Sequence, residues 1–392
     1  MHIKHKVIFY PVGNGDTSQI ILNNGRRILM DYRHQKKGEN PLEPVIDLKA
    51  RLKAELDDAD KDYFDVVAFT HADDDHICGS TDFFELEFAN KYQGNGRIKI
   101  SELWVPAAML LEKTDNDHRS DEFVILRQEA RHRLLEGKGI RVFSKPPELT
   151  EWLLPKLKER GENSNARDHL FVDAGKLVPT FNLFQDGIEF FCHSPFIKHC
   201  AGRDIVRNQA SLIFNIRFNA DNNIYDYLAV GDADSCDLED IVSITQYHQN
   251  NGRLAWDLFN IPHHCSYKAL NAQDKGIDET EPTPLVQELL EMGKADAYIV
   301  SSSRPVKNTK ESYGQVQPPH IQAYKTYDKY LKQIKGRKFL VTMQEPNEQK
   351  PEPLTFEITS DGISFIRTTN IGAPSLITSV PPRAGCNDTR VL

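Results

Sequence analysis

The stretch Thr70-His71-Ala72-Asp73-Asp74-Asp75-His76 follows directly on the apolar run Phe64-Asp65-Val66-Val67-Ala68-Phe69. Two imidazoles and three carboxylates therefore lie within six consecutive positions at the end of a predicted β-strand. Neutral imidazole nitrogen and carboxylate oxygen are ligands that divalent metal ions prefer. A solvated acidic turn could contain the same residues, but the His-x-Asp-x-Asp-His spacing after a strand favours a metal site.

The composition of the chain limits the classes of protein to which it can belong. Its 392 residues are enough for one large domain with insertions or for two domains, and 39% hydrophobic with 27% charged residues is typical of a globular protein. We find no apolar stretch that could span a membrane and no secretory signal at the start, so we expect a cytoplasmic protein without membrane association. The net charge of −9 argues against a broad basic surface for long duplex nucleic acid.

The six cysteines are scattered without a CxxC pair, which is typical of a reducing compartment. Cys78, Cys192 and Cys265 each lie within two residues of a candidate ligand histidine. A thiolate could bind zinc, but small buried cysteines are common, and we interpret these three as core residues.

Hydrophobic periodicity predicts a mixed α/β protein that begins with a hairpin-rich segment at 3–33. The region from about 84 to 180 carries many charges, and we interpret it as a surface insertion that could bind a protein partner. Residues 1–372 are predicted to form one domain, followed by a C-terminal tail at 373–392. The other expected strands are 64–70, 101–106, 187–192, 211–218, 227–230, 258–262, 297–301, 339–344 and 354–360, and the expected helices are 43–60, 122–136, 148–159, 237–249, 284–292 and 319–332.

Further ligand-type side chains follow the ends of later predicted strands. Asp232 follows the apolar residues 228–231 and could ligate a metal or cap the next helix. His193 could be a ligand or an ordinary, partly buried histidine. Of the adjacent His263 and His264 we expect one to ligate, and prefer His264, because neighbouring side chains at a strand edge point to opposite sides.

With these residues in view, the chain resembles the metallo-β-lactamase-fold hydrolases, and among them the hydrolase domain of ComEC-type DNA-uptake proteins. The general family pattern is His-x-His-x-Asp-His. The ComEC-like branch replaces the second histidine of this pattern by aspartate, and this chain has Asp73 at that position. The matching motifs keep family order from residue 6 to about 305. They are Val12-Gly13-Asn14-Gly15-Asp16, Ile28-Leu29-Met30-Asp31, Asn208-Gln209-Ala210-Ser211-Leu212, Gly231-Asp232 and His263-His264-Cys265-Ser266.

The resemblance implies a four-layer αββα sandwich with two divalent metal ions at one edge, for which zinc is preferred over manganese. By position, His71, Asp73 and His193 would hold one ion. Asp75, His76 and His264 would hold the other, and Asp232 would bridge them. Asp75, Asp232 and His264 would be catalytic, with Asp75 orienting a hydroxide activated by both metals, while Asp16 and Asp31 would hold imidazoles in place.

The chain departs from the ComEC-like pattern at Cys78 and Cys265, where the branch has glycine, and at Tyr32-Arg33, where it has a small residue. The substrate of the branch is therefore not carried over.

Several residues are candidates for contacting substrate: Ser302 and Arg304 in Ser301-Ser302-Ser303-Arg304, together with Lys268, Arg33 and His320. Hydroxyls and a guanidinium at a strand end suit phosphate oxygens, although the same residues could form a capped turn. His320 could donate a proton to a leaving group or be a surface helix histidine.

Three functions compete for these residues. The first is a metal-dependent hydrolase of phosphodiesters, a nuclease or an enzyme for a smaller phosphodiester, with single-stranded nucleic acid among the candidate substrates. The second is hydrolysis of a carboxylic ester, lactone or thioester by the same centre. The third is a metal-bound scaffold without turnover, which recruits a partner through the charged region 84–180.

Overall fold

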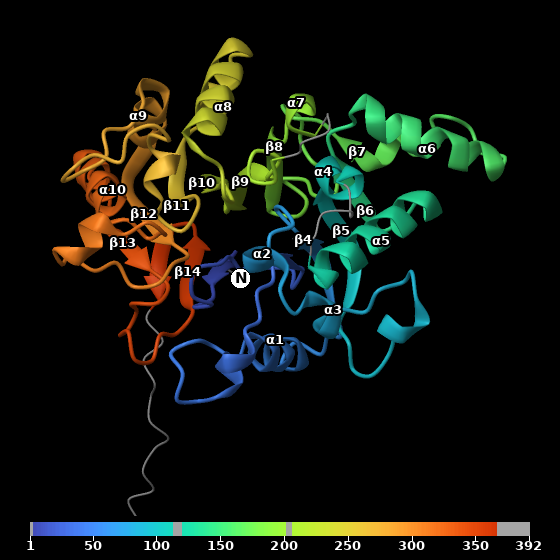
Figure 1. The fold of residues 1–392 in the computed structure, drawn as a ribbon, viewed down its shortest axis with the longest axis horizontal. Coiled ribbons are helices and arrows are strands. Elements are labelled where there is room, and N and C mark those ends of the chain that lie inside the picture. Colours follow the sequence, from blue (N-terminus) through green and yellow to red (C-terminus); the bar gives the residue numbers. More distant parts are fainter. Residues whose placement is uncertain (1–2, 113–119, 201–205, 367–392) are drawn as a thin grey trace, which may run out of the picture.

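Two β-sheets face each other at the centre of the computed structural model, which describes residues 3–112, 120–200 and 206–366 (Figure 1). Within these ranges, the strand order of the first sheet is β15-β14-β1-β2-β3-β4-β5-β6-β7, and that of the second is β13-β12-β11-β10-β9-β8. The tail predicted at 373–392 lies outside the described residues.

The first sheet contains β1 (His5–Phe9), β2 (Ser18–Ile21), β3 (Arg27–Met30), β4 (Tyr63–Ala68), β5 (Lys99–Pro106), β6 (Ile140–Phe143), β7 (Phe171–Val172), β14 (Leu354–Thr359) and β15 (Gly362–Ile366). The second contains β8 (Ile188–Ser194), β9 (Ile213–Ala220), β10 (Asn223–Ala229), β11 (Trp256–Asn260), β12 (Gly293–Ser301) and β13 (Lys338–Val341).

The helices and 3-10 turns form the outer layers and connections. They are η1 (Lys36–Glu39), α1 (Leu48–Asp57), α2 (Asp74–Ile77), α3 (Ser80–Phe83), η2 (Asn90–Tyr92), α4 (Ala107–Leu111), α5 (Asp121–Glu136), α6 (Pro147–Glu159), η3 (Asp168–Leu170), α7 (Ile197–Cys200), α8 (Ser235–Tyr247), η4 (Asn251–Arg253), η5 (Tyr267–Ala269), α9 (Pro284–Glu291), η6 (Glu311–Gly314) and α10 (Ile321–Gln333).

The apolar side chains form three cores that define four layers. The core between the sheets combines residues of β1–β6 with residues of β8–β12, and Trp104 of β5 packs there against Phe190 of β8 and Phe214 of β9. A second core lies between the first sheet and α1, α4, α5 and α6. The third lies between the second sheet and α8, α9 and α10. The predicted αββα sandwich is therefore confirmed.

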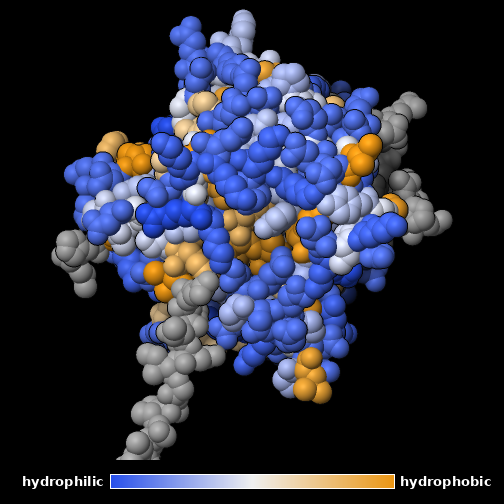
Figure 2. Space-filling view, turned by 90° about the vertical axis from the view of Figure 1, so that its left-hand side faces the viewer, coloured by the Kyte–Doolittle hydropathy of each residue, from blue (hydrophilic) through white to orange (hydrophobic). Residues whose placement is uncertain are grey.

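The molecular surface is consistent with the burial of most apolar side chains in the three cores. The face shown in Figure 2 is largely hydrophilic, with apolar residues visible in a few small groups. In the described residues, no helix combines the length and apolarity needed to cross a membrane.

Residues 84–180 correct one prediction, because they do not form a surface insertion. β5, β6 and β7 continue the first sheet in parallel from β4, and Leu103 and Val142 are completely buried. The high charge content is misleading because part of it is internal. Arg133 and Glu129, one turn apart on α5, form an ion pair of 2.6 Å at 2% and 0% side-chain exposure.

The ends of helix α1 show what a periodicity argument misses. A helix is expected over 43–60, but α1 begins at Leu48 because the Asp47 side chain accepts a hydrogen bond from Ala50 N and caps the helix there. The helices expected at 122–136 and 148–159 start one residue earlier, as α5 and α6.

The parallel strands bring separate parts of the chain to one edge. β10, β11 and β12 run parallel, so the segments after Ala229, Asn260 and Ser301 leave the second sheet on the same side. Leu212 N, at the start of β9, donates to Thr70 O, which joins this edge to the segment that follows β4. The predicted convergence of strand ends is thus present.

Candidate metal centre

The histidine loop, defined as residues 70–76, turns back on itself so that its two histidines meet. β4 ends at Ala68, and the short helix α2 starts at Asp74, which returns His76 to the neighbourhood of His71. The two ring centroids lie 3.9 Å apart. His71, Asp75 and His76 can place one donor atom each within 4.8 Å of one another.

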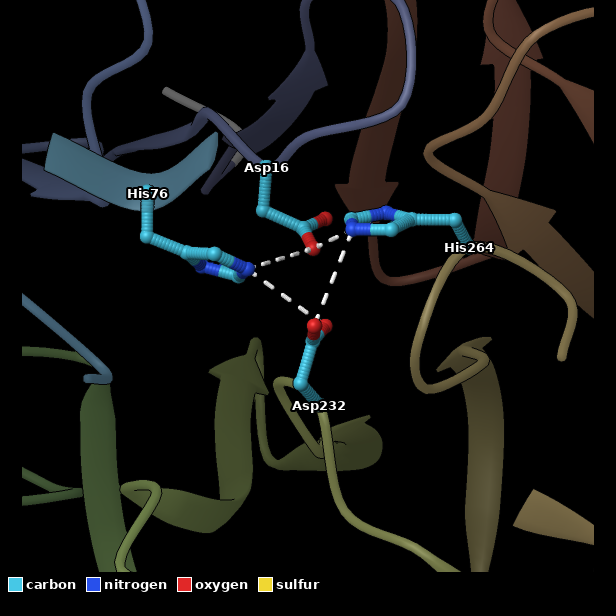
Figure 3. Close-up of side chains that lie close together, drawn as sticks. All are labelled: Asp16, His76, Asp232 and His264. Carbon is cyan, nitrogen blue, oxygen red and sulfur yellow. Dashed lines mark ion pairs between the residues drawn. The ribbon is translucent and has the colours of Figure 1, made fainter. Parts of the chain in front are cut away.

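A second group of donors lies around Asp232 (Figure 3). The His76 Nε2 atom is 3.4 Å from Asp232 Oδ1 and 3.8 Å from Asp16 Oδ2. The His264 Nε2 atom is 3.7 Å from Asp232 Oδ2. All four residues are buried, and their donor atoms come from the β1–β2 connection, α2, the end of β10 and the turn after β11. We call the union of the two groups the donor cluster; its members are Asp16, His71, Asp75, His76, Asp232 and His264.

Two histidines of the donor cluster are held with Nε2 toward its centre. His76 Nδ1 lies 2.7 Å from Asp31 Oδ2, and His264 Nδ1 lies 2.9 Å from the carbonyl oxygen of Ser302. Because both partners are acceptors, each Nδ1 carries a proton and donates it. Nε2 is then the ring atom that can bind a metal ion, once the ion has displaced the proton that Nε2 carries in the metal-free protein. The roles of Asp31 and Ser302 are therefore to orient imidazoles.

Replacing Asp31 by asparagine tests this orientation. Asp31 also accepts hydrogen bonds from Thr70 N at 2.7 Å and Thr70 Oγ1 at 2.6 Å, so it ties His76 to the start of the histidine loop. We expect Asp31→Asn to lower metal affinity by roughly 10- to 100-fold, the usual effect of losing such a partner. Chelator competition measures the change, and an affinity equal to that of the unsubstituted protein would contradict the assignment.

The turn after β11 has an unusual backbone that selects His264. His263, His264 and Cys265 have consecutive positive φ values of 51°, 54° and 66°. Left-handed conformations of non-glycine residues cost energy and persist where the surrounding structure enforces them. The turn brings His264 Nε2 to the donor cluster, whereas His263 is not among the candidate donors. The preference for His264 agrees with this placement, but its cause is a turn rather than alternation along a strand.

Buried polar atoms without hydrogen-bond partners show whether a metal ion would fit in the donor cluster. Among the described residues, His71 Nε2, His76 Nε2 and Asp232 Oδ1 are buried without a hydrogen-bond partner. Such atoms normally have partners, and these three lie close together, with His76 Nε2 3.4 Å from Asp232 Oδ1 and His71 Nε2 3.9 Å from Asp232 Oδ2, so a divalent cation fits between them. Imidazole and carboxylate donors in this number suit a divalent ion.

The electrostatics of the donor cluster also favour a cation. Burial alone would favour neutral groups, yet the pKa of His76 is raised well above its ordinary value by Asp31 and Asp232. Conversely, burial would raise the pKa of Asp232, but His264 and His76 hold it well below its ordinary value. The carboxylates therefore remain charged, and in the absence of a metal ion protonated histidines neutralise them.

Asp16 is closer to the centre than expected. It was predicted to support an imidazole, but its carboxylate lies within ligand range of His76, His264 and Asp232. The Gly-Asn-Gly-Asp motif allows this approach, because a Cβ atom on Gly15 would lie 2.7 Å from the carbonyl oxygen of Asp75. Asn260 Nδ2 donates to Asp16 Oδ1 at 3.4 Å.

His193 is not brought to the donor cluster. Its Nε2 donates to the carbonyl oxygen of Arg253 at 3.0 Å, and its Nδ1 lies 3.2 Å from Thr245 Oγ1 of α8. Along β8, Phe190 and Cys192 point into the core between the sheets, so alternation directs His193 to the outer face. We therefore remove His193 from the ligand set implied by the resemblance.

The predicted substrate residues are divided between the interior and the surface. Lys268 and Arg304 are exposed. Ser302 is buried, and its hydroxyl donates to Asn260 Oδ1 at 3.3 Å, so it belongs to the support of the cluster. His320 is neither on the surface nor free to donate a proton to a substrate. It is buried, accepts from Tyr267 N and donates to Val316 O.

The cysteines near the candidate ligands are not part of the donor cluster. Cys192 and Cys265 are buried and Cys78 is partly buried, and none belongs to a candidate metal-binding group of the described residues. The residues that sequence analysis missed are Arg207, which contacts Asp73, and Glu112, which contacts Arg207. Neither lies in a motif with a recognisable metal-binding pattern.

No protein-family model and no curated protein matches the chain. Among solved structures, it is similar to a diphosphatase of the PhnP family, with 12% identity and a TM-score of 0.30 over 91% of this chain and 99% of that chain. A class B3 di-zinc metallo-beta-lactamase from an Alaskan soil metagenome has 11% identity and a TM-score of 0.31 over 83% and 90%. A long form RNase Z from yeast has 10% identity and a TM-score of 0.34 over 87% and 40%.

The layers and the donor cluster, rather than these alignments, define the class. The protein is an αββα sandwich with a buried cluster of histidines and aspartates that could hold divalent metal ions at one edge. The narrower resemblance to ComEC-type hydrolase domains stays a prediction.

Proposed function

We propose that the protein is a metal-dependent hydrolase that acts on a phosphodiester. The observation that carries the proposal is that His71 Nε2 and His76 Nε2, both buried without a hydrogen-bond partner, lie 3.9 Å and 3.4 Å from the oxygens of the buried Asp232 carboxylate. The residues that would hold two divalent ions, with zinc preferred over manganese, are His71, Asp73, Asp75, His76, Asp232 and His264, with Asp16 as a further donor.

Bound divalent ions would lower the pKa of a shared water toward neutrality and stabilise charge on the attacking and leaving oxygens. The chain itself supplies orientation and a proton acceptor. Burial would raise the pKa of Asp75, but its contacts with His264 and His76 lower it, so this carboxylate stays ionised. Asp75 Oδ2 is 3.1 Å from His264 Nε2, a position from which it can orient a nucleophilic water.

Arg33, which lies near Asp75, favours an anionic substrate over a neutral one. A Cβ atom on Gly15 would lie 2.3 Å from Arg33 Cδ and 2.7 Å from Asp75 O, so the Arg33 side chain passes beside the histidine loop. Arg304 N donates to Asn14 Oδ1 at 2.8 Å, which holds the backbone of Arg304 at the same glycine-rich turn, while its side chain is exposed. Guanidinium groups bind phosphate oxygens through paired hydrogen bonds.

A substrate panel tests the proposal. Hydrolysis of bis-p-nitrophenyl phosphate is compared with hydrolysis of p-nitrophenyl acetate, a lactone and a thioester, at matched zinc or manganese, with His71→Ala as the inactive control. Faster turnover of the diester supports the proposal. Turnover of acyl substrates alone would replace it by the second candidate function, and two bound metals without any turnover would favour the scaffold.

Arg33→Ala is expected to raise KM for the phosphodiester by roughly 10-fold, as befits the loss of one charged hydrogen bond, and to leave kcat/KM for p-nitrophenyl acetate unchanged. Arg337→Ala is the matched control, because Arg337 is an exposed arginine that pairs with Asp296. Steady-state kinetics on both substrates measure the difference. Equal losses on the two substrates would show that Arg33 does not select for phosphate.

A further inference from the structure

Arg207 reaches the histidine loop from the connection that precedes β9. Its Nη1 atom donates to Asp73 Oδ1 and to the carbonyl oxygen of Ala72, each at 2.7 Å. Leu212, five residues along, is fixed to the same loop through Thr70 O at 2.9 Å. The guanidinium therefore contacts both the side chain and the backbone of the segment that carries the candidate ligands.

The opposite side of Arg207 is held by the outer helical layer. Arg207 Nε lies 3.0 Å from each carboxylate oxygen of Glu112, whose side chain is only 4% exposed. The guanidinium carbon also lies 4.7 Å from the ring centroid of Phe123 in α5. An ion pair on one side and an aromatic ring on another leave the guanidinium little freedom to move.

Asp73 needs such a support. Its side chain is 38% exposed, far more than those of Asp232 and His264 at 4% and 3%, so it could turn toward solvent. With Oδ1 engaged by Arg207, the other oxygen, Oδ2, lies 3.5 Å from His71 Nε2. Although burial would raise it, the pKa of Asp73 is lowered to about 2 by its contacts with His71 and Arg207.

We infer that Arg207, anchored by Glu112, is a positioning residue that holds Asp73 so that only Oδ2 is presented, beside His71, to a divalent metal ion. The inference rests on the metal-binding part of the proposed function, but not on its substrate. One oxygen of Asp73 is bound to Arg207, so a metal ion beside His71 would be offered a single carboxylate oxygen whose direction is already fixed.

Metal affinity tests this inference without reference to turnover. Zinc binding by Arg207→Ala and Arg207→Lys is measured by chelator competition, and the visible absorption of the cobalt-substituted proteins reports ligand geometry. We expect Arg207→Ala to weaken one of the two metals by roughly 10- to 100-fold and to alter the cobalt spectrum. Arg207→Lys should recover part of the affinity, because lysine keeps the charge but not the planar fork.

Two further variants separate positioning from folding. Arg207→Ala removes one partner of the buried Glu112 carboxylate and lowers stability, so the double variant Arg207→Met, Glu112→Gln removes both charges together. It should fold and still show the weakened metal. Arg217→Ala is the matched control, because Arg217 forms a partly buried ion pair with Asp226, at 24% and 4% exposure, outside the donor cluster, and should keep both affinities.

Each result decides the question. Unchanged affinity and an unchanged cobalt spectrum in the folded double variant would overturn the inference. Absence of metal binding by the unsubstituted protein would overturn both this inference and the proposed function. Two bound metals, weakened selectively by Arg207→Ala but without hydrolysis of any substrate, would overturn the proposed function alone.

Discussion

Asp232→Asn is expected to reduce hydrolysis by on the order of 10³-fold or more and to lower the metal content of the purified protein. Asp232 is the residue that contacts all three histidines of the donor cluster. Its Oδ1 is 3.4 Å from His76 Nε2, and its Oδ2 is 3.7 Å from His264 Nε2 and 3.9 Å from His71 Nε2. Asparagine keeps the shape but replaces one oxygen by an amide group, which cannot ligate, and it removes the negative charge.

Asp234→Asn is the control for this variant, because it makes the same chemical change two residues away. Asp234 caps α8 by accepting from Cys236 N and Asp237 N, and asparagine caps helices about as well as aspartate. Elemental analysis and steady-state kinetics should show full metal content and activity for Asp234→Asn. Two equivalents of metal with normal turnover in Asp232→Asn would exclude a bridging role.

The sequence predicted the layers of the fold because the buried parallel strands are short apolar runs. β4, β11 and β12 were recognisable in this way, and the polar residues that follow them were recognisable as candidate ligands. The region 84–180 was misassigned because its charges were assumed to face water, whereas Arg133 and Glu129 neutralise each other inside the protein. Pairwise compensation of this kind is invisible to a composition argument.

Within the site, local motifs were more informative than side-chain direction. The His-x-Asp-x-Asp-His spacing identified His71, Asp75 and His76, which the structure brings together. His193 was misplaced because the resemblance supplied its role, and only the observed strand shows which face it occupies. The partnership of Arg207 with Asp73 spans 134 residues of sequence, so no local pattern could have predicted it.

Removal of the metal with a chelator is expected to destabilise the protein, and the loss of stability should grow as pH rises. Although burial would lower it, the carboxylates of Asp232 and Asp75 raise the pKa of His264 in the metal-free protein to about 9, from an ordinary value of 6.5. A raised folded-state pKa contributes stability that is complete below about pH 6.5 and disappears as pH rises through about 9. His76, whose pKa is also raised, acts in the same direction.

The stability that bound metal contributes has the opposite pH dependence, because the metal binds unprotonated imidazole and replaces the protons of the histidines. The difference in thermal midpoint between zinc-loaded and chelator-treated protein should therefore widen from pH 6 to pH 9. At a free zinc concentration about 100 times the Kd, binding contributes about 2.7 kcal/mol. Differential scanning calorimetry at pH 6, 7.5 and 9 measures the effect, and His264→Gln should flatten it. A difference in thermal midpoint that stays constant from pH 6 to pH 9 would show that the metal does not displace protons from these imidazoles.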